Sequence, residues 1–347
     1  MKKVLLIRLS SLGDCIFNIP LANILKRNGY RVTWLVSEKG YGVIKDNPCV
    51  DEVILAPFVK WKKRGFSFEN FKEYLEIVKK IRAEKFDITL DTQMLIKGFY
   101  FNIFSGAKRR IVAKSAREFS FLGGNEIIDV KDYKKKCSAI RNYLKFADYL
   151  GLDTSKIEVT LPNSDENTKN KINELLNNKI DTTKPVAVIA PATTWIPKHW
   201  SKDNWKELIK KIEEHFNLIF TGTENDKELI SYICGDNYIN LAGKTDLKGL
   251  IEVFRRADLV LSLDSGSTHL AWATQKPKII TLFCCTPPYL YAPQGSDDKY
   301  IALSGNLSCQ HCHKRKCQLK QNKNQCTFLP EVGEVLKAIN KLMNCEL

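Results

Sequence analysis

The sequence predicts an α/β protein built from two Rossmann-like domains, and three observations point to this class. At 347 residues the chain is long for a single hydrophobic core. Apolar runs of strand length alternate with amphipathic runs of helix length in both halves, which is the rhythm of a parallel sheet covered by helices. Each half also contains a strand, a small-residue turn that bears an acid, and a helix, around residues 10–14 and 264–269.

The first half alternates strand and helix, and we expect an N-terminal domain over residues 1–165. Its expected strands are residues 2–8, 31–37, 52–56 and 86–91, and its expected helices are residues 15–28, 69–84, 94–104 and 137–150. An Asn- and Lys-rich stretch follows, with one helical patch and a Thr-Thr-Lys-Pro end. We interpret residues 166–184 as the linker.

The second half repeats the alternation, and we expect a C-terminal domain over residues 185–347. Its expected strands are residues 185–190, 217–221, 238–241, 258–263 and 278–283, and its expected helices are residues 202–214, 224–235, 247–256, 267–275 and 331–343.

The turn from Ser10 to Asp14 follows a strand that reads Lys-Lys-Val-Leu-Leu-Ile-Arg, an apolar run typical of a strand covered on both faces. The next helix is expected to end near Gly29, and Pro20 predicts a late start or a kink. Asp14 therefore stands beyond the C-terminal edge of the predicted sheet, where open α/β sheets hold their ligands.

The turn from Asp264 to His269 reads Asp-Ser-Gly-Ser-Thr-His and opens a helix after an apolar strand. Such a turn directs backbone N–H groups and the positive helix end toward the space above the sheet, which suits a phosphate group. A plain strand-to-helix connection explains this turn equally well when it is considered alone. Its weight comes from the matching turn in the first half.

Composition is that of an ordinary soluble protein, with 44% hydrophobic and 27% charged residues, and no apolar run approaches the ~20 residues of a membrane span. Arg8 interrupts the first apolar run, so we expect no signal peptide and a cytoplasmic protein. The net charge is +15, and basic clusters lie at residues 60–64, 108–110 and 134–136. A nucleic acid, an anionic membrane surface, a phosphorylated substrate or a solvated lysine-rich surface each fits this charge.

Six motifs follow one another along nearly the whole chain. They are Ser10-Ser-Leu-Gly-Asp14, Asp91-Thr-Gln-Met-Leu-Ile-Lys97, Ala192-Thr-Thr-Trp-Ile-Pro-Lys-His-Trp200, Gly222-Thr-Glu-Asn-Asp226, Asn240-Leu-Ala-Gly-Lys-Thr245 and Asp264-Ser-Gly-Ser-Thr-His-Leu270. This set resembles the bacterial lipopolysaccharide heptosyltransferases of glycosyltransferase family nine. The resemblance implies a GT-B fold, in which two Rossmann-like domains face each other across a cleft.

The resemblance also implies an activity, the transfer of heptose from ADP-heptose to the Kdo–lipid A inner core with inversion. The second and third motifs are more similar to the first heptosyltransferase than to the second. A family-nine relative with another acceptor is the nearest alternative. A basic nucleic-acid-binding protein with a zinc-knuckle-like loop is the more distant one, and two acid-bearing Rossmann-type turns argue against it. We expect a monomer, peripheral on the inner face of the cytoplasmic membrane, with no nucleic-acid partner.

Asp14 is the expected catalytic base, because an inverting transfer needs a carboxylate to deprotonate the acceptor hydroxyl. The family's catalytic aspartate matches this position, and a helix N-cap is the alternative role. Lys198 is the expected partner of the leaving diphosphate, since its loop offers an ammonium group together with the hydroxyls of Thr193 and Thr194. A surface lysine is the alternative there. No catalytic cofactor is implied.

Donor contacts are expected at residues that the motifs share with the family. Those in turns and loops would bind phosphate, Asp264 would contact heptose hydroxyls, and Glu224 or Asp226 would hold the ribose. His269 is equally well explained as a packed helix residue. The full set is Ser11, Gly13, Thr193, Thr194, Glu224, Asp226, Thr245, Asp264, Ser265, Gly266, Ser267, Thr268 and His269.

The anionic acceptor implied by the resemblance needs basic residues in the first half. The matching positions are Lys62, Lys63, Arg64, Lys97 and Arg117. Each is explained as well by a solvated surface side chain.

A cysteine cluster at residues 309–326 contains Cys309, Cys312, Cys317 and Cys326, at spacings typical of metal ligands. A structural zinc ion, disulfides and free thiols are the three alternatives, and a reducing cytoplasm disfavours disulfides. The chain also departs from the family at Cys284-Cys-Thr-Pro-Pro288, where a Gly-Pro is usual. We expect this loop to border the donor.

Overall fold

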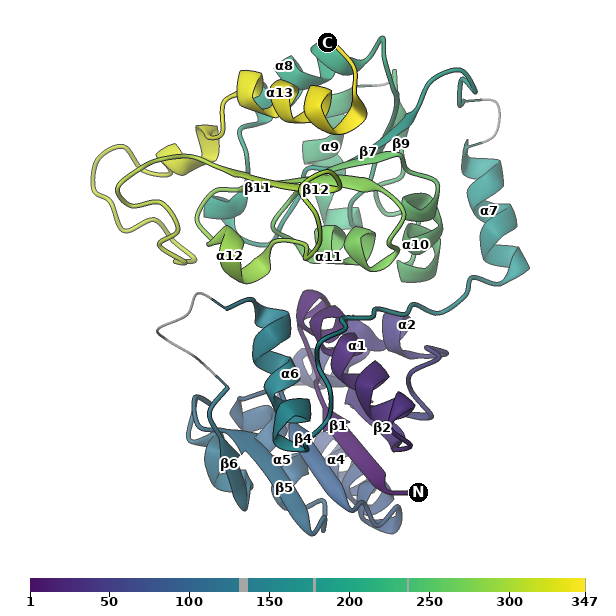
Figure 1. The fold of residues 1–347 in the computed structure, drawn as a ribbon, viewed down its shortest axis with the longest axis vertical. Helices are drawn as coiled ribbons and strands as arrows, with labels where there is room; N and C mark the ends of the chain where they lie inside the picture. Colours follow the sequence, from purple (N-terminus) through teal and green to yellow (C-terminus); the bar gives the residue numbers. More distant parts are fainter. Residues whose placement is uncertain (131–136, 177–178, 236, 347) are drawn as a thin grey trace. The chain divides into compact units, whose positions relative to one another are not determined.

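The computed structural model describes residues 1–130, 137–176, 179–235 and 237–346, so the basic cluster at residues 134–136 lies outside the described residues. The chain divides into two compact units, Met1–Asn163 and Ser164–Leu347. Each unit is a six-stranded sheet with helices on both faces (Figure 1). The predicted α/β class with two Rossmann-like domains is therefore confirmed.

Unit 1 contains the elements expected from the first half, together with two short strands and two short helices that the hydrophobic pattern did not indicate. The strands are β1 (Lys3–Ile7), β2 (Arg31–Val36), β3 (Glu52–Leu55), β4 (Ile88–Asp91), β5 (Arg109–Ala113) and β6 (Glu126–Ile128). The helices are α1 (Leu12–Arg27), α2 (Glu38–Ile44), α3 (Phe58–Arg64), α4 (Phe68–Ala83), α5 (Ile96–Ile103) and α6 (Ala139–Tyr149), with a 3₁₀ turn at Ser120–Gly123.

The sheet of unit 1 has the strand order β3-β2-β1-β4-β5-β6, and all its strand pairs are parallel. Successive strands add outward from β1, and the chain then returns to place β4 on the other side of β1. Leu5 and Ile7 face a core shared with α4 and α5. Helices α1 and α6 lie side by side on the opposite face (Figure 1). The strand order reverses between β1 and β4, and open sheets of this kind hold ligands at the C-terminal ends of the strands on either side of such a reversal.

Helix α1 begins directly after the first turn, so the late start that Pro20 predicted is wrong. Ser11 occupies the N-cap position and Leu12 the first helical position, while Pro20 lies inside the helix and is buried. Ten of the other residues of this helix are also buried, and their burial outweighs the loss of one backbone hydrogen bond at proline.

Unit 2 repeats the same construction. Its strands are β7 (Val186–Ala190), β8 (Asn217–Phe220), β9 (Ile239–Asn240), β10 (Leu259–Leu263), β11 (Lys278–Phe283) and β12 (Tyr300–Ser304). Its helices are α7 (Glu166–Leu176), α8 (Lys202–Ile212), α9 (Lys227–Cys234), α10 (Leu247–Arg255), α11 (Gly266–Ala273), α12 (Pro288–Tyr291) and α13 (Val332–Met343), with 3₁₀ turns at Ile196–Lys198, Glu224–Asp226 and Gln325–Phe328.

The strand order of unit 2 is β12-β11-β10-β7-β8-β9, again all parallel, so the reversal falls between β7 and β10. Helices α8, α9 and α13 cover one face with a shared apolar core, and α10 and α11 cover the other (Figure 1). Helix α7 occupies the helical patch of the stretch interpreted as a linker and packs on α10.

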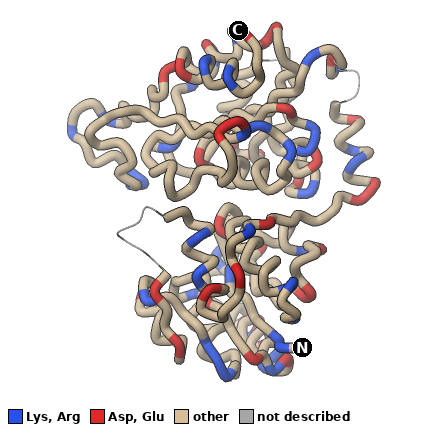
Figure 2. The backbone as a smooth tube through the Cα atoms, viewed as in Figure 1, with Lys and Arg blue, Asp and Glu red and all other residues tan. Residues whose placement is uncertain are grey.

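Charge is distributed over both units, and Lys and Arg positions recur along the whole tube in Figure 2. Within the described residues, no helix combines the length and the apolar character needed to cross a membrane.

Candidate active site

The turn between β1 and α1 holds the carboxylate of Asp14 at the first helical turn. Ser11 is the N-cap residue, and Asp14 is three positions further on. Asp14 Oδ2 accepts hydrogen bonds from the Ser11 backbone N–H at 3.2 Å and from the Ser11 hydroxyl at 2.9 Å. Asp14 is therefore the acidic partner of a capping box and not the N-cap itself. Its side chain keeps 28% of its surface exposed, which leaves the carboxylate open to a substrate.

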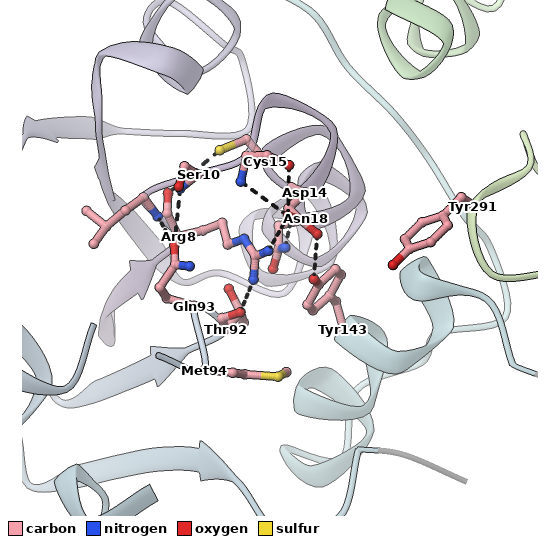
Figure 3. Close-up of polar contacts among 12 residues, drawn as sticks. Arg8, Ser10, Asp14, Cys15, Asn18, Thr92, Gln93, Met94, Tyr143 and Tyr291 are labelled. Atoms are coloured by element: carbon pink, nitrogen blue, oxygen red, sulfur yellow. Dashed lines mark hydrogen bonds and ion pairs between the residues drawn. The ribbon is translucent and has the colours of Figure 1, made fainter. Parts of the chain in front are cut away.

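Two buried residues hold this carboxylate from the other side (Figure 3). The Arg8 guanidinium lies 2.7 Å from Asp14 Oδ2, and the Tyr143 hydroxyl donates to Asp14 Oδ1 at 2.9 Å. The Arg8 guanidinium also lies over the Tyr143 ring, 5.0 Å from its centroid. Burial alone would raise the pKa of Asp14, but the charge of Arg8 and the hydrogen bonds from Ser11 and Tyr143 outweigh it and lower the pKa. Asp14 is therefore an ionised, oriented carboxylate at neutral pH.

The end of β4 fixes the turn in which Asp14 lies. Gln93 Oε1 accepts from the backbone N–H groups of Leu9 at 2.9 Å and Ser10 at 3.1 Å, and Arg8 donates to the carbonyl of Thr92 (Figure 3). Lys97 donates to the Ser10 hydroxyl at 2.5 Å. The second motif thus contacts the first motif across the strand-order reversal of unit 1. Of the predicted residues, Ser11, Gly13, Asp14 and Lys97 come together here.

Arg8, Gln93 and Tyr143 belong to this site although no site role was predicted for them. Arg8 carried a signal, because a charged residue ending a buried strand needs a partner at the sheet edge. Gln93 was part of a motif without an assigned role. Tyr143 carried no signal, since helix α6 brings it to Asp14 from 129 positions away.

The remaining predicted acceptor residues lie on the surface of unit 1. Lys62, Lys63 and Arg64 form the exposed last turn of α3, and Arg64 pairs with Glu73 of α4 at 3.2 Å. Arg117 is exposed in the connection after β5, and its backbone N–H donates to the carbonyl of Met94. Charge on an exposed helix end remains available to an anionic partner.

In unit 2 a buried ion pair joins the loop after β7 to the end of β10. Lys198 Nζ lies 2.6 Å from Asp264 Oδ2, and the Thr286 hydroxyl donates to the same oxygen at 2.7 Å. His269 Nε2 lies 3.6 Å from the other oxygen, Oδ1. Burial opposes ionisation of Asp264, yet hydrogen bonding from His269 and the charge of Lys198 lower its pKa. Asp264 is therefore ionised, and its carboxylate fixes the position of the lysine ammonium.

Aromatic rings flank the Lys198 ammonium, which lies 4.8 Å from the Trp195 ring centroid and 5.8 Å from that of Tyr291. The Thr193 hydroxyl donates to the Asp264 carbonyl at 3.4 Å, whereas Thr194 is exposed. An ammonium group has three donors, so one anchored by Asp264 can still donate to a phosphate oxygen.

In the N-terminal turn of α11, some residues contact the sheet and others are available to a ligand. Thr268 is fully buried, and its hydroxyl contacts the Leu263 carbonyl and lies 2.8 Å from the Ser262 hydroxyl. Its side chain therefore braces β10, and the predicted donor contact would have to come from its backbone. The Ser265 hydroxyl is buried and has no hydrogen-bond partner among the described residues. An unsatisfied hydroxyl beside Gly266 and Ser267 at a helix start suits a phosphate.

The structure distinguishes the two predicted ribose ligands. Asp226 Oδ2 accepts from the Thr223 backbone N–H at 2.8 Å and from the Thr223 hydroxyl at 2.6 Å, so Asp226 caps its own turn. Glu224 has a side chain 69% exposed and a surface pairing with Lys227 at 2.6 Å. Glu224 is therefore the freer carboxylate. Thr245 is half-buried in the loop after β9.

The loop from Cys284 to Pro288 borders Asp264 through Thr286. Cys284 Sγ donates to the His199 carbonyl at 3.3 Å, and Cys326 Sγ to the Pro197 carbonyl at 3.8 Å, so these thiols contact the backbone on both sides of Lys198. The departure from the family's Gly-Pro thus supplies a hydroxyl to the buried ion pair and a thiol to the lysine loop.

The cysteine loop has the four predicted thiols near one another. Burial and the charges of Cys312, Cys309 and Cys317 raise the pKa of Cys326 to about 11. All 11 cysteines are free thiols in the structure. In the part of the chain that the structure describes, no group of three or more His, Cys, Asp or Glu side chains is placed to hold a metal ion. The structural zinc ion stays a prediction without a formed ligand set.

Each Rossmann-like unit carries polar groups where its strand order reverses. Unit 1 holds the ionised carboxylate of Asp14, and unit 2 holds Lys198 paired with Asp264 beside the start of α11. This fold and these sites define a glycosyltransferase of the GT-B class. Residues 74–323 match the family model described as glycosyltransferase family 9 (heptosyltransferase). The chain belongs to glycosyltransferase family 9.

Named relatives agree with this assignment. The chain is 27% identical to lipopolysaccharide heptosyltransferase 1 of Campylobacter coli, over 99% of this chain and 100% of that protein. It is also 27% identical to lipopolysaccharide heptosyltransferase 1 of Escherichia coli, over 85% and 92%. Among solved structures, heptosyltransferase WaaC of Escherichia coli with ADP has a TM-score of 0.74 at 22% identity, covering 98% of this chain and 99% of WaaC.

Proposed function

We propose that this protein transfers heptose from ADP-heptose to the Kdo–lipid A inner core, with inversion at the anomeric carbon. The observation that carries the proposal is the Asp14 carboxylate, held ionised by Arg8 and Tyr143 and left partly exposed at the strand-order reversal of unit 1. The relatives named lipopolysaccharide heptosyltransferase 1 support transfer of heptose to lipopolysaccharide, and the structure of WaaC with ADP-2-deoxy-2-fluoro heptose supports the donor.

In the proposed reaction, an acceptor hydroxyl gives its proton to Asp14 while its oxygen bonds to the anomeric carbon of heptose. The bond from that carbon to the distal phosphate oxygen breaks, and ADP leaves. A carboxylate oxygen accepts two hydrogen bonds, and Oδ1 accepts one, from Tyr143, among the described residues. Oδ1 is therefore our proposed proton acceptor. A carboxylate of lowered pKa suffices, because an oxocarbenium-like centre makes the attacking hydroxyl strongly acidic.

Unit 2 is the proposed donor-binding unit. Lys198, fixed by Asp264, would stabilise the charge that develops on the leaving diphosphate, together with the Ser265 hydroxyl and the first N–H groups of α11. Glu224 would hold the ribose. Thr193, Thr194, Thr245, Asp264 and His269 remain proposed donor contacts, as do Ser11 and Gly13 in unit 1. We further propose that the monomer works in the cytoplasm, attached to the inner membrane surface by basic residues of unit 1.

The experiment is a mass-spectrometric transfer assay with ADP-heptose and Kdo–lipid A. Addition of one heptose, with an anomeric configuration by NMR that is opposite to that of the donor, is the expected result. Parallel reactions offer UDP-glucose as donor and already heptosylated Kdo–lipid A as acceptor. Transfer only to the heptosylated acceptor would mean that the protein acts as a second heptosyltransferase, and no transfer from ADP-heptose to either acceptor would refute the proposal.

A further inference from the structure

One surface of unit 1 exposes large apolar side chains that contribute little to its core. Phe66 is 110% exposed, Phe68 78%, Phe119 75% and Leu122 62%. Phe71 and Tyr100 are 55% and 48% exposed. These six residues are called the aromatic face below. Exposed aromatic groups in such number on one unit are costly in water and typical of a docking surface.

The aromatic face is continuous because the segments that carry it contact one another. The loop after α3 and the start of α4 are held together by Asn70, whose amide donates to the Gly65 carbonyl at 2.6 Å, and Trp61 of α3 donates to Glu73 of α4 at 2.8 Å. Helix α4 meets α5 where the Tyr74 hydroxyl donates to the Tyr100 carbonyl at 3.3 Å. Helix α5 meets the segment that carries Phe119 where Glu118 accepts from the Ile96 backbone N–H at 2.9 Å.

Backbone conformation projects two of the rings. Gly65, with φ of 75°, ends α3 and reverses the chain before Phe66. Phe119 itself has φ of 54°, a conformation that aromatic residues rarely adopt. A phenylalanine in this conformation, with its ring exposed, is a candidate for contact with a partner.

Basic side chains lie on the same segments. Lys62, Lys63 and Arg64 precede Phe66 by four, three and two positions, and Arg117 precedes Phe119 by two. A second copy of this chain would bring the same positive charges against each other, which disfavours self-association through this face. An anionic bilayer has an apolar interior that can bury the rings and a layer of headgroup phosphates that can pair with the lysines.

We propose that the aromatic face inserts into the surface of an anionic phospholipid bilayer, with its rings below the headgroups and the neighbouring lysines and arginines on the headgroup phosphates. This inference rests on the membrane attachment proposed above and changes its nature. Attachment by charge alone is lost at high salt, whereas inserted rings hold the protein by apolar burial that salt does not screen.

Vesicle sedimentation tests the proposal with the full chain. Vesicles contain phosphatidylcholine alone or with roughly 30% phosphatidylglycerol, and each is measured at low salt and at about 0.5 M NaCl. The test variant is Phe66→Ser, Phe68→Ser, Phe119→Ser. The matched control is Tyr232→Ser, which removes an exposed aromatic ring from α9 of unit 2. Thermal melting and light scattering establish that each variant is folded and monomeric.

The wild type and the control should bind the anionic vesicles and retain measurable binding at high salt. The triple variant should bind about tenfold more weakly at low salt and lose the salt-resistant part. Equal binding by the triple variant, or a wild-type attachment that high salt abolishes, overturns insertion. A wild-type dimer that the triple variant dissolves assigns the face to a second copy instead. Transfer to an acceptor without acyl chains, measured without vesicles, reports on the proposed function separately.

Discussion

The Tyr143 hydroxyl donates to Asp14 Oδ1 at 2.9 Å, joining the helix that closes unit 1 to the turn that opens it. Arg8 occupies the other carboxylate oxygen and lies against the Tyr143 ring. The carboxylate is thus fixed at both oxygens by groups that favour its ionised form.

Tyr143→Phe should raise the pKa of Asp14 and lower kcat by about tenfold, because one hydrogen bond to a charged group is lost. The transfer needs the carboxylate form, which exists above the pKa of Asp14. A higher pKa therefore moves the acid limb of the kcat/KM profile to higher pH. The pH profile of the variant is compared with that of Tyr149→Phe, an exposed tyrosine on the same helix. An acid limb that stays in place, with kcat unchanged, would show that the phenol does not position the base.

Asp14→Asn should lower kcat by ~10²–10⁴, the usual contribution of a general base, and leave ADP binding unchanged. It should also lower Tm, since buried Arg8 loses its counter-ion. Turnover is measured by mass spectrometry and ADP affinity by calorimetry. Glu334→Gln is the control, because it removes the corresponding capping carboxylate of α13, away from any proposed site. Near-normal turnover of Asp14→Asn removes this residue as the base.

Lys198→Ala should weaken ADP binding about tenfold or more, because an ammonium–phosphate contact is lost. It also strips Asp264 of its counter-ion, so the pKa of Asp264 should rise and the variant should melt at a lower temperature. Calorimetry with ADP gives the affinity. Lys202→Ala, a surface lysine near Tyr232, should bind ADP like the wild type. Unchanged affinity in Lys198→Ala would mean that the ammonium serves only the buried ion pair.

Replacing Lys62, Lys63 and Arg64 together by Ala should raise the KM of a water-soluble anionic acceptor and leave the KM of the donor nearly unchanged. The effect should shrink at high salt, since exposed charges are screened. The control replaces Lys79, Lys80 and Arg82 of α4, another basic helix end in unit 1. If the KM of the donor rises instead, the two units have the opposite roles to those proposed.

The cysteine loop should stabilise the fold and take no part in transfer. Cys309→Ser with Cys312→Ser should lower Tm more than it lowers kcat per folded molecule, because only the folded loop profits from a cross-link or a metal. Elemental analysis and thiol titration of protein purified without chelator separate the alternatives. If the protein contains less than about a tenth of an equivalent of zinc and all four thiols react, the loop holds neither a metal ion nor a disulfide. A folded, chelator-treated protein that no longer turns over would contradict the structural role.

The two domains and their long helices and strands could be predicted, because the spacing of apolar residues indicates which face of each helix or strand is buried. Strands such as residues 31–37 and 278–283 are largely apolar on both faces, a pattern typical of parallel strands between helix layers. Strands β5 and β6 escaped prediction because they are short and polar at one end, and β6 also lies at the sheet edge, where burial is incomplete. Helix α3 was missed because seven residues are too few for a helical period to stand out.

The site could be predicted as far as contiguous motifs reach. Asp264 directly follows β10, and Asp14 and Lys198 lie in the connections after β1 and β7, so sequence position alone places them near the C-terminal edges of the sheets. Tyr143 is a single residue in ordinary surroundings, and Thr286 had no assigned role within its unusual loop; only tertiary packing brings them to the two carboxylates. The pairing of Lys198 with Asp264 was equally invisible, because both residues were read as separate contacts to a ligand.

The strand-order reversal in unit 1 has a consequence for the order of events during synthesis. Its carboxylate site is assembled from residues 8–14, 91–97 and 143. The second and third of these segments must therefore each pack against the first, across long stretches of chain, before the site is complete. The chain emerges from the ribosome with Asp14 first and Tyr143 near the end of the unit. A nascent unit 1 that stops before α6 therefore has its base without the phenol that orients it, and the carboxylate acquires its final setting only when the last helix docks.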